Sequence, residues 1–102
     1  MLRIRRRISE KSIFSSRNLV SDECIEYKLN YYLIVEEVSG NDGELILENY
    51  GIKVSIESGG KEENIELRNI TINELRIRSL LTMLSDNCVT PTSVLDVVFD
   101  WL

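Results

Sequence analysis

Basic side chains gather at the start of the sequence, in the stretch LRIRRRISEK over residues 2–11. Guanidinium and ammonium groups bind phosphate oxygens and carboxylates, so this stretch is suited to contact a polyanion or an acidic surface. Residues 1–17 hold six basic side chains against one acidic one, a net +5, whereas the rest of the chain holds six against sixteen, a net −10. The charge is therefore segregated, and the candidate contact residues are Arg3, Arg5, Arg6, Arg7 and Lys11.

Three explanations of this basic arm, residues 1–22, stay open. Leu2, Ile4 and Ile8 alternate with arginines, so the arm could add an edge strand with its charges in solvent. It could instead pair with acidic surface on its own body or on a neighbouring copy, which would make a homo-oligomer. Third, it could contact phosphates of nucleic acid, although a body of net charge −10 repels a polyanion.

Two further residue pairs have the chemistry of a partner-binding surface. Asp96 and Asp100 are four positions apart, so on a helix they share one face. That face is either simply solvated or an acidic docking strip for a basic partner. Tyr32 and Ile34 occupy the otherwise polar phase of a strand, so either another element covers them or they form an exposed patch that binds a partner.

Other chemistry is disfavoured by composition. Histidine is absent, which removes the usual general base, the commonest metal ligand and the usual partner of a serine or cysteine nucleophile. Cys24 and Cys88 are far apart and are interpreted as small buried residues, so neither a metal nor a cofactor is expected. Because no signal peptide or long apolar run is present, we expect a cytoplasmic protein without membrane contact.

The elements that would position these residues follow from the hydrophobic pattern. An apolar set with period two predicts a long strand over residues 24–36, and it consists of Ile25, Tyr27, Leu29, Tyr31, Leu33 and Val35. The return segment 44–58 changes phase beside Gly51, which predicts a bulge at residues 49–51 that keeps both phases on one core. A third strand is expected over residues 64–70.

Two helices follow the strands. Thr71 and Glu74 have the spacing of a capping box, which predicts that the first helix begins there. Within it, Arg76 is expected to reach water or Asp96. Thr90 and Pro91 are suited to start a second helix, and its inward-facing residues are predicted to be Val94, Leu95, Val97, Val98, Trp101 and Leu102.

These elements predict an α+β fold: an antiparallel meander of three strands, or of four if the arm adds one, with two C-terminal helices packed on one face. The predicted organisation is a basic N-terminal arm or edge strand over residues 1–22 and a single α+β domain over residues 23–102. Strand order in the sheet is left open.

The segments YYLIVEEV, ENYGIKV and TPTSVLDVVFDWL together resemble a family of small proteins of unknown function from clostridia and other Firmicutes. The resemblance covers about residues 24–102 and leaves the basic run outside. It implies a bacterial cytosolic setting, and it transfers no activity or catalytic residue.

We therefore expect a small non-enzymatic binding module that regulates or accompanies another protein. Its candidate partner-binding residues are Tyr32, Ile34, Asp96 and Asp100. The alternative is an accessory factor of a DNA-handling machine, for instance a recombination or transcription cofactor, that places the basic arm on nucleic acid. An enzyme is the least supported class.

Overall fold

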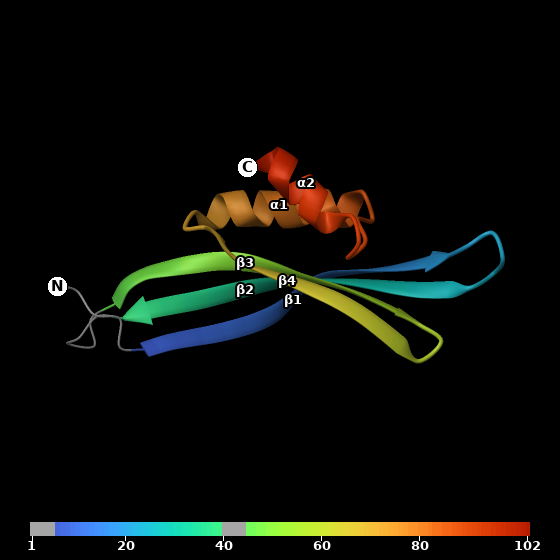
Figure 1. The fold of residues 1–102 in the computed structure, drawn as a ribbon, viewed down its shortest axis with the longest axis horizontal. Coiled ribbons are helices and arrows are strands. Elements are labelled where there is room, and N and C mark those ends of the chain that lie inside the picture. The colour runs from blue at the N-terminus through green and yellow to red at the C-terminus, as the bar shows by residue number, and fades with distance from the viewer. Residues whose placement is uncertain (1–5, 40–44) are drawn as a thin grey trace.

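The computed structural model describes residues 6–39 and 45–102 and has the predicted α+β composition (Figure 1). Four strands precede two helices: β1 (Arg6–Val20), β2 (Glu26–Ser39), β3 (Leu45–Ser58), β4 (Lys61–Thr71), α1 (Glu74–Asp86) and α2 (Val94–Trp101). The strands pair antiparallel in the order β1-β2-β3-β4, which is the predicted meander with its fourth strand. Most of the basic arm thus forms the edge strand β1.

The core lies between the sheet and α1, which lies over the sheet and contacts all four strands (Figure 1). Leu29, Tyr31 and Leu33 point toward α1 from one phase of β2, because successive side chains of a strand face opposite ways. The helix contributes its fully buried residues Ile77, Leu80, Leu81 and Leu84. The predicted inward phase of the strand at residues 24–36 is therefore correct over its central part.

Tyr31 connects this core to the loop between the helices. Its hydroxyl donates to the backbone carbonyl of Val89 at 2.9 Å, while its ring is fully buried. Burial raises the pKa of Tyr31 to about 12 because the ionised phenolate would be poorly solvated there. The buried ring and its hydrogen bond together fix the start of the segment that leads to α2.

α1 begins at a different cap from the predicted one. Asn73 is the N-cap, and its side-chain oxygen accepts from the backbone amide of Arg76 at 3.1 Å. Thr71 is the last residue of β4, and its hydroxyl accepts from the amide of Asn73 instead. The predicted capping box is wrong because β4 pairing extends through Thr71, which leaves Asn73 as the first side chain able to cap.

The bulge also differs from the prediction. Tyr50 pairs with Thr71 and Ile52 with Leu67, so Gly51 of β3 lies opposite three residues of β4, numbers 68–70. The extra residues are therefore in β4, where Asn69 adopts a positive φ of 58°. Pairing of β2 with β3 runs without a shift through this level, so Leu47 stays on the opposite face from Tyr50 and is partly exposed.

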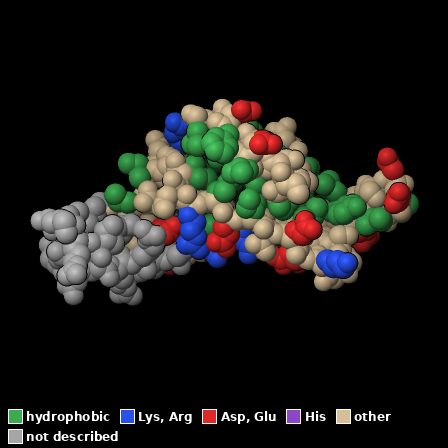
Figure 2. Space-filling view, in the orientation of Figure 1, with side chains coloured by type: hydrophobic (Ala, Val, Ile, Leu, Met, Phe, Trp, Pro, Cys, Tyr) green, Lys and Arg blue, Asp and Glu red, His purple; other side chains and the backbone are tan. Residues whose placement is uncertain are grey.

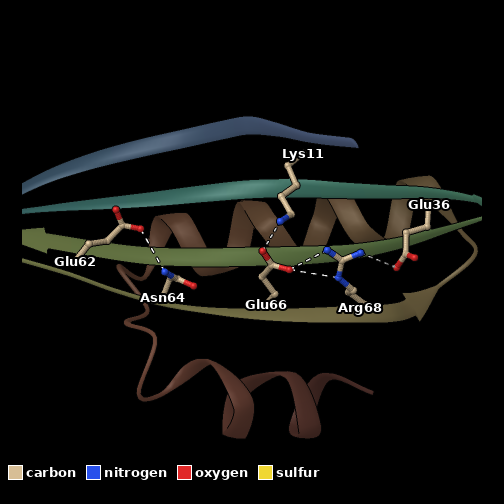
Figure 3. A network of polar contacts seen from close by, with 6 residues as sticks. All are labelled: Lys11, Glu36, Glu62, Asn64, Glu66 and Arg68. Atoms are coloured by element: carbon tan, nitrogen blue, oxygen red, sulfur yellow. Dashed lines mark hydrogen bonds and ion pairs between the residues drawn. The ribbon is translucent and has the colours of Figure 1, made fainter. Parts of the chain in front are cut away.

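α2 is shorter than predicted and begins at Val94. Residues 90–93 form a turn instead, in which the backbone amides of Ser93 and Val94 both donate to the carbonyl of Thr90. Figure 3 views the sheet from the side away from α1, with α2 lying beyond the edge formed by β4. Val94 and Val98 join the common core from there. α2 therefore buries only part of its apolar surface.

Candidate partner-binding surface

α2 exposes apolar side chains that the sequence did not predict to be outside. The exposed fractions are 44% for Leu95, 68% for Phe99 and 69% for Leu102. Their spacing of four and three positions places them in one stripe along the helix. Leu95 and Leu102 were predicted to face inward, and this is wrong because α2 packs against α1 with only its Val94 and Val98 side fully covered.

The predicted acidic strip lies on the same helix as these three apolar side chains. Asp96 and Asp100 are both exposed, and the sequence of α2, VLDVVFDW, has no basic residue to neutralise them. Figure 2 shows hydrophobic side chains gathered over the helices with acidic side chains among them. α2 therefore presents a combined apolar and acidic surface, which we call the α2 stripe: Leu95, Asp96, Phe99, Asp100 and Leu102.

The helix that carries this stripe is fixed from beneath. Val94 is fully buried and Val98 nearly so. The guanidinium of Arg76 in α1 lies 4.5 Å from the centre of the Trp101 ring, which is a cation–π contact at the end of α2. Arg76 is exposed, which is one of the two outcomes predicted for it, and its guanidinium contacts Trp101 rather than Asp96. No sequence signal distinguished these two partners of Arg76.

A cavity of ≈ 280 Å³ opens between the α2 stripe and the edge of β4. We call it the α2–β4 groove, and its lining consists of Glu66, Leu67, Arg68, Asn69 and Ile70 from β4 with Leu95, Val98, Phe99 and Leu102 at its other side. The β4 part of this lining includes the bulge opposite Gly51. Apolar side chains and a polar rim are typical of a site that receives a side chain of a ligand or partner.

Tyr32 and Ile34 do not form an exposed patch, which was one of the two outcomes predicted for them. Ile34 is fully buried although its face of the sheet is the one away from α1. It lies between Lys11 of β1 and Gly51 of β3, and the long side chain of Lys11 passes over it. Tyr32 is half-buried, with the Lys53 ammonium 5.1 Å from its ring centre. Neither residue offers an exposed apolar surface to a partner.

The Lys11 side chain reaches across the sheet toward Glu66 (Figure 3). Its ammonium forms an ion pair with Glu66 on β4, two strands beyond β2, and the path lies over Gly51, which has no side chain. Glu66 also binds Arg68 at 3.0 Å, and Arg68 lies 3.6 Å from the buried carboxylate of Glu36. The hydrogen bond from Lys11 is the main cause that lowers the pKa of Glu66.

The other basic residues of the arm are described only in part. Arg3 and Arg5 lie outside the described residues, as do the side chains of Arg6 and Arg7. Arg17, further along β1, forms an ion pair with Asp86 at 3.0 Å. Lys11 and Arg17 are therefore both engaged with acidic groups of their own chain, as one of the three explanations of the arm expected.

A larger cavity of ≈ 620 Å³ lies where the β1–β2 and β3–β4 hairpins separate. Its lining holds two lysines, Lys28 and Lys61, and three glutamates, Glu26, Glu57 and Glu62, so the charge is mixed and slightly negative. Within residues 6–39 and 45–102, no three metal-binding side chains come together. In the same ranges, no helix has the length and apolar character needed to cross a membrane.

Comparison with known proteins gives a family and no function. A family model, described as a family of unknown function (DUF6514), matches residues 10–102, which include most of β1 and every later element. Neither the curated proteins nor the solved structures contain a match. Because the model covers more than nine-tenths of the chain, this protein belongs to DUF6514, a family of unknown function.

Proposed function

We propose that this protein is a small, non-enzymatic cytoplasmic module that binds another protein through the α2 stripe and regulates or accompanies it. The observation that carries the proposal is the exposure of Phe99 and Leu102, each more than two-thirds accessible, beside Leu95. Such a contiguous apolar area on a folded protein is typical of an interaction site. Aromatic and aliphatic anchors of this kind supply most of the energy of a protein interface.

The rigidity of α2 supports the same proposal. Val94 and Val98 hold the helix to the core, and Arg76 holds Trp101. The exposed side chains are therefore presented in a fixed geometry, which lowers the entropy that a partner has to offset on binding. The complete absence of histidine favours binding over catalysis.

The nucleic-acid alternative is less well supported. A DNA-binding arm requires basic groups that are available to phosphates. Lys11 and Arg17 already bind Glu66 and Asp86, and a phosphate would have to displace those carboxylates. α2 itself carries only acidic charge. These contacts favour a protein partner.

Cross-linking in the native host tests the proposal. We expect the full chain to capture a partner and the Phe99→Ser variant to lose that capture. Ile13→Ser is the matched control, because Ile13 is 59% exposed on β1 and is far from α2 in the fold. Unfolding curves of both variants should match the unmodified chain, since each substitution changes an exposed residue. Equal capture by the Phe99→Ser chain would contradict the proposal.

A further inference from the structure

The size and lining of the α2–β4 groove indicate what kind of partner side chain it can receive. This inference rests on the proposed function. The groove volume of ≈ 280 Å³ exceeds the roughly 150 Å³ that accommodates a benzene molecule in an apolar protein cavity. The apolar part of the lining consists of Leu67 and Ile70 from β4 with Leu95, Val98, Phe99 and Leu102. The groove can therefore receive one large aromatic or aliphatic side chain.

The β4 side of the groove favours insertion of a side chain over addition of a strand. A partner strand needs an uninterrupted row of backbone donors and acceptors on the sheet edge. Here the bulge at residues 68–70 interrupts the edge, and Asn69 has a left-handed backbone with φ of 58°. Bulges of this kind prevent edge pairing in natural sheets. The partner segment should therefore cross the groove and anchor by its side chains.

The charged groups in and beside the groove favour a partner segment that is basic. Glu66 and Arg68 line the groove and already bind each other at 3.0 Å. Asp96 and Asp100 do not line the groove, but both are exposed on α2, which has no basic residue, so the charge that α2 adds beside the groove is negative. Cationic side chains next to the anchor would pair with these two carboxylates and steer the encounter.

The same charges argue against a second copy as the occupant. In a two-fold pair formed through α2, each residue of the stripe meets the equivalent surface of the other copy. Asp96 and Asp100 would then approach the same two carboxylates, with no basic residue on either helix to separate them. Like charges brought together at an interface oppose association. A foreign segment of opposite charge satisfies both the apolar and the acidic part of the surface.

We propose that the α2–β4 groove binds a segment of a partner protein that carries one large apolar side chain flanked by lysine or arginine. The anchor occupies the groove beside Phe99, and the flanking cations pair with Asp96 and Asp100. The apolar contact supplies affinity, while the ion pairs set the choice of segment and make it sensitive to salt.

Selection from a random peptide display library with the full chain as bait tests this inference. We expect enriched peptides that place Lys or Arg within a few positions of Phe, Trp, Leu or Ile. One such peptide, synthesised and titrated against the chain, should lose about tenfold or more in affinity for Phe99→Ser and for Asp96→Lys/Asp100→Lys. The matched control is Asp22→Lys/Glu23→Lys, which makes the same charge change at an exposed turn and should leave affinity unchanged.

The possible failures are distinguishable. Acidic or uncharged peptides that still depend on Phe99 would overturn the partner chemistry and leave the proposed function intact. Selected peptides that ignore every α2 substitution, or no enrichment at all, would overturn the inference. If light scattering instead detects a dimer that Phe99→Ser abolishes, the groove belongs to a second copy and the inference is also wrong.

Discussion

Replacing Gly51 by alanine should force β4 away from β3 at the bulge. A Cβ atom at this position would lie 2.3 Å from the carbonyl oxygen of Leu67 and 2.9 Å from the Cα of Arg68, both in the backbone. Real Cβ contacts stay at 3.0 Å or more, so β4 must move by the difference of at least 0.7 Å. Overpacking costs roughly 1–3 kcal/mol, and each weakened backbone hydrogen bond adds about 1 kcal/mol.

We therefore expect Gly51→Ala to lower the free energy of unfolding by about 3 kcal/mol, a large part of the roughly 5–15 kcal/mol typical of a native domain. The control is Gly59→Ala, where a Cβ meets nothing within 4 Å and only the φ of 56° is strained, at about 1 kcal/mol. Urea unfolding followed by circular dichroism gives both values. If Gly51→Ala costs no more than Gly59→Ala, the proposed close approach of β3 and β4 is wrong.

Three further predictions concern single contacts. Tyr31→Phe should lower the free energy of unfolding by about 1 kcal/mol at neutral pH, because the carbonyl of Val89 loses its donor. The folded pKa of Tyr31, about 12, lies above its ordinary value of 10.0, so the stability advantage of the unmodified chain over Tyr31→Phe should shrink as pH rises between those values, as urea titrations would show. The folded pKa of Glu66 is lowered, so its stabilisation is present above its ordinary pKa of 4.5 and is lost as pH falls below it. Glu66→Gln should therefore destabilise the chain at pH 7 and little in acid, as acid titrations of unfolding would check, and an equal loss at both would refute it. Arg76→Met should cost roughly 0.5–1 kcal/mol and change Trp101 fluorescence, whereas an unchanged spectrum would contradict the ring contact.

The fold class followed from local patterns, and its strongest part was the strand at residues 24–36. A period of two needs only that side chains alternate across a sheet, so the buried positions of Leu29, Tyr31 and Leu33 could be predicted without knowing any partner strand. The bulge was different. Gly51 marked the correct level of the sheet, but which strand carried the extra residues depended on how β4 met it.

The candidate site was predicted in part. The helical spacing of Asp96 and Asp100 was sufficient to place both on one accessible face of α2. The apolar half of the site was missed because α2, with the sequence VLDVVFDW, has hydrophobic residues on several sides. A pattern of this kind does not predict which side packs against the core. For Tyr32 and Ile34 two outcomes were left open, and Ile34 takes the covered one, because Lys11 of β1 pairs beside it.

Residue types and short-range spacing were enough to predict the segregation of charge, the phase of the strand at residues 24–36 and the order of strands before helices. The ion pair of Lys11 with Glu66 across the sheet and the outward position of Phe99 on α2 could be seen only in the folded chain. Both outcomes are long-range: they depend on which surfaces remain after α1 has covered the sheet, and no local pattern contains that information.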